Sequence, residues 1–258
     1  MRYVYLDEID STNSYAKSLC CYPQDEQPGA GSTRARANNF SRGELTVIRA
    51  KRQRGGRGRD GNAFFSDHAG GLWATIITRI ADISTHFEHN RAISLSIRKA
   101  LCECMPAPSA PISIKWPNDI YWGDKKIAGI LLENATQNPN ALIIGFGINI
   151  NIAADDFPAE LRGKATSVLM ETGDEHMPGA VLEGILREYS FILKHGSQGA
   201  HTVYAGSLYK KGCLAAVGQH RGIFSTVELD GRLRLETNQG SMLLSSGTLR
   251  FLEGAGCE

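Results

Sequence analysis

The hydrophobic and polar positions of this chain follow two different patterns, one up to residue 211 and one from residue 212 onward. In the first part, short apolar runs rich in β-branched residues predict strands. These runs cover residues 3–6, 45–50, 72–80, 112–116, 127–133 and 142–152. Because helical segments lie between them, we expect an α/β (α+β) domain with a mixed sheet.

Apolar residues spaced by three and four positions predict helices in the same part of the chain. Segment 88–104 carries Ile93, Ile97 and Leu101 on one face, and three prolines follow it. In segment 178–194, a proline suits the first turn and the apolar residues form one continuous stripe. Near the start, residues 10–13 offer several N-caps for a further helix.

From residue 212 onward, apolar and polar residues alternate with a period of two. Residues 223–229 follow this alternation, and Asp230-Gly231 is a strong hairpin signal before the next strand. Further strands are predicted from Met242 and over 248–251. Several short strands with tight turns and no helix indicate a small β-barrel, so we expect two domains, 1–211 and 212–258.

The composition is that of an ordinary globular protein. Of the 258 residues, 42% are hydrophobic and 21% are charged, and a formal net charge of +1 gives the whole chain no attraction to polyanions. The first ten residues lack the apolar core of a signal peptide, and no apolar run has the length of a membrane span. We therefore expect a cytoplasmic protein without membrane contact. Six cysteines without a C-x-x-C pair predict reduced thiols, and the polar residues 22–43 predict a surface loop.

The sequence KRQRGGRGRDG at residues 51–61 combines five cations with four glycines. Glycine lets backbone N–H groups approach an anion, and arginine adds permanently charged donors, so the segment suits an anionic ligand. Three other interpretations are a dinucleotide-binding G-x-G-x-x-G loop, an RNA-binding Arg-Gly segment and a solvated basic loop. The dinucleotide interpretation requires a helix directly after the loop, and residues 62–71 have no helical pattern.

A second polar segment, KWPNDIYWGDKKIAGILLE at residues 115–133, joins two strand-like runs. Pro117 interrupts regular structure, and Asn118 and Asp119 either hydrogen-bond locally or point into a cleft. Lys126 begins an apolar strand. A lysine there either covers the strand end with its stem or directs its ammonium group at a ligand.

Together and in this order, these segments closely resemble the biotin–protein ligases. The resemblance rests on GGRGRDG at 55–61, KWPND at 115–119, KIAGIL at 126–131 and GFGININ at 145–151. The S-T-N segment of the family is matched by residues 11–13, and its A-T-S segment resembles residues 165–167. The resemblance covers nearly the whole chain. Its pattern starts at Tyr3, as in members without an N-terminal helix-turn-helix, so we expect no DNA binding.

The resemblance implies a mixed-sheet catalytic domain, an SH3-like C-terminal barrel and a two-step reaction. The biotin carboxylate attacks the α-phosphate of ATP to give biotinyl-5′-AMP and pyrophosphate. A lysine of a biotin carboxyl carrier protein or domain then takes the biotin. Mg²⁺ on the phosphates shares the charge stabilisation. Homodimers that form through sheet edges are frequent in the family.

The resemblance also implies roles for individual residues, and catalysis is expected from Lys126, Arg57 and Arg59 because two anions must be brought together. The residues expected to bind biotin are Ser11, Thr12, Asn13, Gln53, Arg57, Gly58, Arg59, Lys126 and Gly129. Those expected to bind ATP are Arg59, Asn118, Asp119, Lys126 and Asn149, with Asp119 as the candidate protein ligand of Mg²⁺.

Two positions depart from the family pattern, because Asn62 stands where a basic residue is frequent and Phe64 where a tryptophan is frequent. The many glycines of residues 52–64 also lead us to expect that this loop becomes ordered when ligand binds. Two other functions stay open. A lipoate–protein ligase shares the fold but lacks the G-R-G-R and K-W-P-N-D signals, and a nucleic-acid-binding module would use the cations of residues 51–59.

Overall fold

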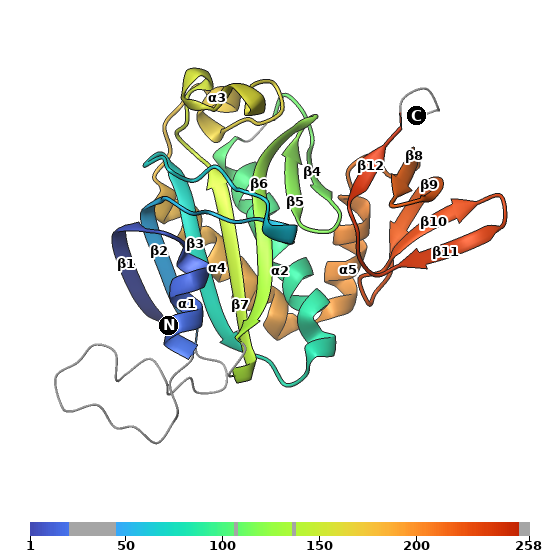
Figure 1. Cartoon of the computed structure of the whole chain (residues 1–258), viewed down its shortest axis with the longest axis horizontal. Coiled ribbons are helices and arrows are strands. Elements are labelled where there is room, and N and C mark those ends of the chain that lie inside the picture. The colour runs from blue at the N-terminus through green and yellow to red at the C-terminus, as the bar shows by residue number, and fades with distance from the viewer. Residues whose placement is uncertain (21–44, 106–107, 136–137, 253–258) are drawn as a thin grey trace. The chain divides into compact units, whose positions relative to one another are not determined.

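The computed structural model describes residues 1–20, 45–105, 108–135 and 138–252, and the described residues form two sheets (Figure 1). The first sheet has seven strands in the order β1-β2-β3-β7-β6-β5-β4. Its strands are β1 (Arg2–Ile9), β2 (Thr46–Gln53), β3 (Gly71–Arg79), β4 (Ile112–Lys115), β5 (Asp119–Trp122), β6 (Lys125–Ala135) and β7 (Asn138–Asn149). The β1–β2 pair is parallel, whereas β2–β3, β3–β7, β6–β7 and β4–β5 are antiparallel. The predicted mixed sheet is therefore confirmed, while the predicted loop 22–43 lies outside the described residues.

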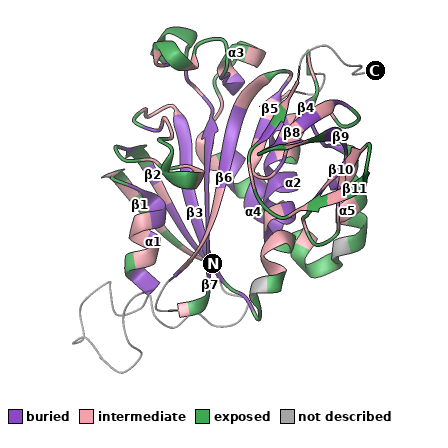
Figure 2. Ribbon diagram, turned by 45° about the vertical axis from the view of Figure 1, so that its right-hand side comes forward, coloured by how far each residue is buried: buried purple, intermediate pink, exposed green. Residues whose placement is uncertain are grey.

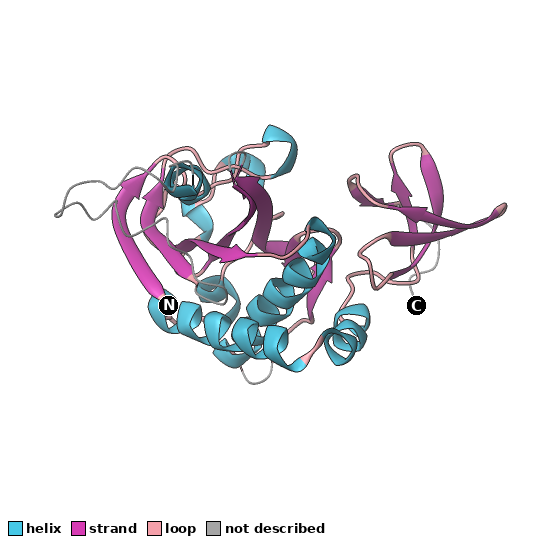
Figure 3. Ribbon diagram, turned by 90° about the horizontal axis from the view of Figure 1, so that it is seen from below, coloured by secondary structure: helices cyan, strands magenta, loops and turns pink. Residues whose placement is uncertain are grey.

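The second sheet is antiparallel and has five strands in the order β11-β10-β9-β8-β12. Its strands are β8 (Leu214–Val217), β9 (His220–Val227), β10 (Leu233–Thr237), β11 (Gly240–Leu244) and β12 (Leu249–Phe251). From Leu214 to Leu252 the chain contains strands and turns but no helix (Figure 3). The predicted turn is confirmed, because the Gly231 N–H donates to the Glu228 carbonyl and Gly231 has a φ of 92°.

Five α-helices connect or flank these strands within the described residues. They are α1 (Thr12–Cys20), α2 (His86–Cys104), α3 (Val168–Thr172), α4 (Pro178–His195) and α5 (Ser197–Gly206). The patterns along the chain predict α1, α2 and α4. The α2 and α4 helices lie side by side, because His89 Nδ1 lies 2.6 Å from the Tyr189 hydroxyl and Lys99 pairs with Glu188.

The chain divides into two compact units that do not follow its order. Unit 1 comprises Met1–His86, Ala128–Phe157 and Ser167–Gly179, and unit 2 comprises Phe87–Ile127, Pro158–Thr166 and Ala180–Glu258. Strand β6 contributes residues to both units. The proposed domains 1–211 and 212–258 remain a prediction from the change of pattern along the chain.

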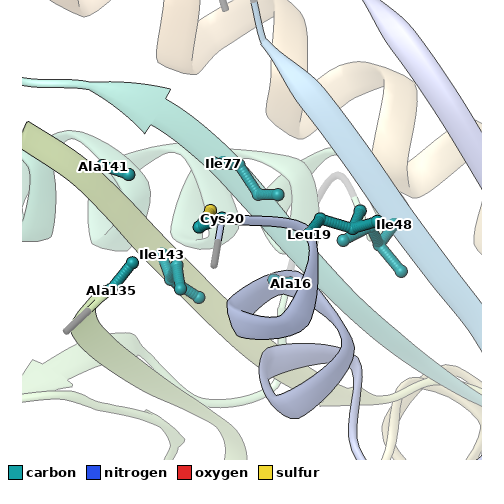
Figure 4. Close-up of a cluster of buried hydrophobic side chains, with 8 residues drawn as sticks. All are labelled: Ala16, Leu19, Cys20, Ile48, Ile77, Ala135, Ala141 and Ile143. Atoms are coloured by element: carbon teal, nitrogen blue, oxygen red, sulfur yellow. The ribbon is translucent and has the colours of Figure 1, made fainter. Parts of the chain in front are cut away.

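The core of unit 1 lies around β3 and β7, which are buried along nearly their whole length (Figure 2). This explains why both strands are continuous apolar runs instead of alternating ones. Helix α1 covers one region of them through Ala16, Leu19 and Cys20, which recur at helical spacing. Figure 4 shows these side chains against Ile48 of β2 and Ile143 of β7. Full burial of one such leucine or isoleucine contributes about 1.5–3 kcal/mol.

The cysteine prediction is wrong at one position. Cys102 and Cys104 are free thiols, but Cys213 is disulfide-bonded. Spacing along the chain could not reveal this bond, because a disulfide requires two thiols to be close in space.

In the ranges that the structure describes, none of the helices is long and apolar enough to cross a membrane.

Candidate active site

The start of α1 carries three buried polar residues of unit 1. Ser11, Thr12 and Asn13 are only 5%, 3% and 6% exposed. The Ser11 carbonyl accepts the N–H of Tyr15, and its hydroxyl lies 3.4 Å from the N–H of Ser14. Ser11 therefore begins the helix as a helix-capping residue does. Buried polar groups need hydrogen-bond partners. The side chains of Thr12 and Asn13 therefore gather further polar groups around them and form a polar site inside an apolar core.

Gln53 closes this polar site from the end of β2. Its Oε1 atom accepts the backbone N–H of Thr12 at 2.7 Å and lies 2.8 Å from the Thr12 hydroxyl. The Gln53 side chain is held further by its own backbone, whose carbonyl accepts the Ser66 hydroxyl at 3.0 Å and whose N–H donates to the Ser66 carbonyl. The structure thus brings Ser11, Thr12, Asn13 and Gln53 together, although Thr12 and Gln53 are 41 positions apart along the chain.

Three further residues of the site are not apparent from the sequence patterns. The Thr75 hydroxyl in β3 lies 2.7 Å from both the Thr12 hydroxyl and Asn13 Oδ1. The Asn13 Nδ2 group donates to Glu133 Oε2 at 2.9 Å, and Lys17 Nζ lies 2.6 Å from Glu133 Oε1. The available signal for Thr75 was a hydroxyl in the middle of the buried apolar run 71–79.

Two glycines of β7 leave room for side chains of the site. A Cβ atom on Gly145 would lie 2.1 Å from Asn13 Oδ1, and one on Gly147 would lie 2.4 Å from the Phe64 ring. In the β6–β7 pairing, Gly147 is opposite Gly129, one of the residues predicted from sequence. The row of glycines lets Asn13 and Phe64 approach the sheet backbone closely. Asn149, also predicted, ends this strand and is buried.

The glycine–arginine segment folds back on itself as a short loop and is not followed by a helix. The Phe64 N–H donates to the Gly56 carbonyl at 2.9 Å, and the Gly58 N–H donates to the Asn62 carbonyl at 2.8 Å. Asp60 and Gly61 form the tip with φ values of 56° and 75°. The dinucleotide-binding interpretation is therefore wrong, because the backbone after Gly61 is extended and the next regular element is β3.

This loop is joined to the start of α1. The Gly55 N–H donates to the Asp10 carbonyl at 2.8 Å, and the Arg57 guanidinium hydrogen-bonds the Ser14 hydroxyl. Arg57 is exposed, whereas Gly58 and Arg59 are half-buried. Phe64 packs edge to face against Trp73, with ring centroids 6.1 Å apart.

Residues 115–127, the first part of the segment that contains Lys126, belong to unit 2 and are held by local contacts there. Strand β6 passes Lys164–Thr166, because the Lys126 N–H donates to the Lys164 carbonyl and the Thr166 N–H donates to the Lys126 carbonyl, both at 2.9 Å. The Lys126 ammonium group lies 2.7 Å from Asp119 Oδ1. The sequence patterns did not predict this ion pair, which orients the ammonium of Lys126 and occupies the carboxylate of Asp119.

The K-W-P-N-D turn is fixed by two side-chain contacts. The Trp116–Pro117 peptide is cis, and Asn90 Nδ2 donates to the Pro117 carbonyl at 2.8 Å. The buried Trp116 donates from its indole nitrogen to the Gly231 carbonyl at 3.0 Å. Asn118 and Asp119 follow this turn directly, and Asp119 opens β5. The turn thus presents the two residues predicted to serve the nucleotide.

Several cations gather around this turn and influence one another. Burial lowers the pKa of Lys115; the Asp119 carboxylate opposes this shift, and the ammonium groups of Lys126 and Lys210 add to it. Lys115 Nζ lies 5.0 Å from the ring centroid of Tyr121, whose pKa is raised to about 12 by burial. Tyr121 therefore stays neutral near pH 7 and does not cancel the positive charge.

The predicted site residues fall into two groups. Those of unit 1 are Ser11, Thr12, Asn13, Gln53, Arg57, Gly58, Arg59, Gly129 and Asn149, and those of unit 2 are Asn118, Asp119 and Lys126. Among the residues that the structure describes, no three His, Cys, Asp or Glu side chains are grouped so as to hold a metal ion.

Comparison with known proteins identifies relatives over most of the chain. Residues 32–149 match the sequence model of the Biotin/lipoate A/B protein ligase family. The Bifunctional ligase/repressor BirA of Bacillus subtilis is 31% identical over 225 residues, which are 83% of this chain and 68% of that protein. The protein of the same name from Bacillus spizizenii is 32% identical over 75% of this chain, but the match spans only 55% of its length.

A solved structure resembles the whole fold. The biotin protein ligase from Aquifex aeolicus in complex with biotin and ATP has a TM-score of 0.77 and 25% identity, and the match covers 97% of this chain and 99% of that one. The sequence identity to the B. subtilis relative and the similarity of fold to the A. aeolicus structure point to the same family. On these findings, the chain belongs to the biotin/lipoate A/B protein ligase family, among its biotin protein ligases.

Proposed function

We infer that this chain is an ATP-dependent biotin–protein ligase, which forms biotinyl-5′-AMP and transfers the biotin to a lysine of a biotin carboxyl carrier protein or domain. The observation that carries the proposal is the junction of a neutral polar cluster and a cationic loop at the start of α1. Thr12 and Gln53 form the buried cluster, and Arg57 reaches the same helix through Ser14. Biotin likewise combines an uncharged ureido ring with a carboxylate.

In the proposed first step, the biotin carboxylate oxygen attacks the α-phosphorus of ATP and pyrophosphate leaves. Both reactants are anions, so the site must supply cations and N–H donors before they can approach. Arg57, Arg59 and Lys126 have this role in the proposal. Arginine suits it because its charge is permanent and its planar donors match carboxylate and phosphate oxygens.

In the proposed second step, the amine of the carrier lysine attacks the acyl carbon of the mixed anhydride. An amide bond forms and AMP leaves. Asn118, Asp119 and Asn149 would bind the nucleotide, and Gly129 would let the β6 backbone pass close to the ligand. The solved A. aeolicus relative, in complex with biotin and ATP, supports both substrates.

Magnesium enters the proposal as the cation carried by the ATP phosphates. The structure does not favour Asp119 as its protein ligand, because that carboxylate is already paired with Lys126 at 2.7 Å. A magnesium ion needs several oxygen ligands in octahedral geometry, which Mg-ATP obtains from phosphates and water. No step of the proposed mechanism therefore depends on a metal site built by the protein.

The remaining parts of the proposal concern partners and location. A near-neutral net charge supports the expectation of no DNA binding, and a cytoplasmic location is proposed from the ordinary globular composition. Homodimerisation is proposed from the family resemblance alone.

The decisive experiment measures biotin-dependent ATP–pyrophosphate exchange, followed by mass spectrometry with a carrier domain. We expect exchange with biotin, no exchange with lipoate, and a mass gain on the carrier that needs protein, biotin and Mg-ATP together. Exchange with lipoate alone would make the chain a lipoate–protein ligase. Nucleic-acid binding that weakens steeply with salt concentration, without any ATP–pyrophosphate exchange, would favour the alternative of a nucleic-acid-binding module.

A further inference from the structure

The buried cluster beneath α1 contains more close oxygen contacts than it has hydroxyl protons. Thr75 Oγ1 lies 2.7 Å from Asn13 Oδ1 and 2.7 Å from Thr12 Oγ1. Thr12 Oγ1 in turn lies 2.8 Å from Gln53 Oε1. These three contacts share the two protons of Thr12 and Thr75, because a hydroxyl donates only one. All four side chains are buried, so bulk water does not supply the missing donor.

The orientation of Asn13 decides where the first proton goes. Its amide nitrogen faces Glu133 Oε2 at 2.9 Å and the Leu131 carbonyl at 3.4 Å, both of which only accept hydrogen bonds. Lys17 pairs with the other oxygen of Glu133 at 2.6 Å and so holds the carboxylate in place. The amide NH₂ group of Asn13 must therefore point to Glu133, and its Oδ1 must point to Thr75.

The orientation of Asn13 determines which hydrogen-bonding groups Thr12 and Gln53 can offer to a ligand. Asn13 Oδ1 is an acceptor, so Thr75 gives its proton to it and has none for Thr12. The Thr12 hydroxyl therefore receives no proton within the cluster and keeps its lone pairs as acceptors. Gln53 must direct Oε1 at the Thr12 N–H, 2.7 Å away, which leaves its NH₂ end as the end that a ligand can meet.

We propose that Thr75 is a positioning residue that sets the proton direction in this cluster, so that Thr12 offers an acceptor and Gln53 offers donors to the ligand. Asn13 and Glu133 fix Thr75 in this role. A cyclic urea carries N–H donors beside a carbonyl acceptor and fits this arrangement, whereas a ring without such groups does not. The inference rests on the proposed function and adds residues that enforce its selectivity.

The test compares Thr75→Val with Thr75→Ser, because valine keeps the shape and removes the proton while serine restores the proton. In biotin-dependent ATP–pyrophosphate exchange, Thr75→Val should raise the KM for biotin about threefold to tenfold, the value of one net hydrogen bond, because it removes the Thr75 oxygen that lies 2.7 Å from the Thr12 hydroxyl and positions it. The KM for ATP should stay unchanged, and Thr75→Ser should restore the KM for biotin. Thr78→Val is the matched control, since Thr78 is a buried threonine of the same strand.

A second variant tests the direction of the chain of hydrogen bonds. Glu133→Gln can donate to Asn13 and so permits its amide to turn, which releases the Thr75 proton toward Thr12. This variant should also raise the KM for biotin, but it should add nothing in the Thr75→Val background, because no proton is left to redirect.

The outcomes separate this inference from the proposed function. If the wild-type protein supports no biotin-dependent exchange, the proposed function fails. If it does, but Thr75→Val leaves the KM for biotin unchanged or alters both KM values equally, the inference is overturned. Additive effects of Thr75→Val and Glu133→Gln would equally contradict it.

Discussion

At the scale of single residues, the loss of the Lys126 ammonium group should slow the first step of the reaction most. We expect Lys126→Met to lower kcat for biotin-dependent exchange by about 10²–10³-fold, because a cation placed where charge develops acts like an oxyanion-hole donor. The same variant leaves the Asp119 carboxylate without its ion pair.

Lys125→Met is the control for Lys126→Met, since Lys125 is the preceding residue of β6 and is also half-buried. It should retain nearly full exchange activity. Equal losses in the two variants would show that a general positive field, and not Lys126 itself, supports the reaction.

Two buried tryptophans of unit 2 allow the value of one hydrogen bond to be measured. Trp116 donates to the Gly231 carbonyl at 3.0 Å, whereas the indole nitrogen of Trp122 has no partner among the described residues. We expect Trp116→Phe to destabilise the protein by about 1 kcal/mol more than Trp122→Phe, because only the first substitution removes a hydrogen bond. Urea unfolding of both variants measures the difference, and equal midpoints would contradict the assigned contact.

The residues of the candidate site were only partly predictable from sequence. Ser11-Thr12-Asn13 and Lys126 were found because they lie in short motifs whose order along the chain resembles a family. Thr75 and Glu133 lie inside strands with no motif, and their function depends on contacts with α1 that only the folded chain forms. The Lys126–Asp119 ion pair was missed for the same reason.

At the scale of secondary-structure elements, prediction succeeded where burial is continuous. The buried strands β3 and β7 and the amphipathic helices α2 and α4 show strong periodic signals. Short elements were missed. Strand β5 begins two residues after Pro117, β8 has four residues, and α5 contains glycines at positions 199 and 206, so none of them has a pattern long enough to be recognised.

The position of helix α1 should depend on Gly145 of β7, because this residue has no side chain and lies against Asn13 of the helix. Gly145→Ala would place a Cβ atom 2.1 Å from Asn13 Oδ1, so Asn13 and the start of α1 must shift. We expect a destabilisation of about 1–3 kcal/mol from overpacking, together with a higher KM for biotin.

Gly199→Ala in α5 is the matched substitution for Gly145→Ala, since a Cβ atom there meets nothing within 4 Å. It should stabilise the protein by about 0.5–1 kcal/mol because alanine favours a helix. Thermal unfolding of both variants should therefore show shifts of opposite sign, and a neutral Gly145→Ala would disprove the close approach of Asn13.

At the scale of the whole molecule, ligand binding should be visible as stability. A ligand that binds only the folded state at one hundred times its Kd adds about 2.7 kcal/mol to the free energy of unfolding. We therefore expect biotin to raise Tm in a concentration-dependent manner, and lipoate at the same concentrations to leave it unchanged. Differential scanning fluorimetry measures both. A Tm that responds to nucleic acid but not to biotin would contradict the proposed ligand.

The two sheets could be predicted from the chain as a whole, because strands between helices and strands between tight turns produce different patterns. The compact units could not. Unit 2 is assembled from three separate stretches, one of which comprises only Pro158–Thr166. A pattern read along the chain carries no information about which distant stretches pack together.

The glycines of β7 also limit how the protein could be adapted to new labelling reagents. A bulky group on a biotin analogue meets Asn13 if it points toward Gly145 and Phe64 if it points toward Gly147, because these side chains lie against the two glycines. A group that points toward Phe64 meets a side chain that can be trimmed. Libraries that select for enlarged analogues should therefore vary position 64 and keep both glycines fixed.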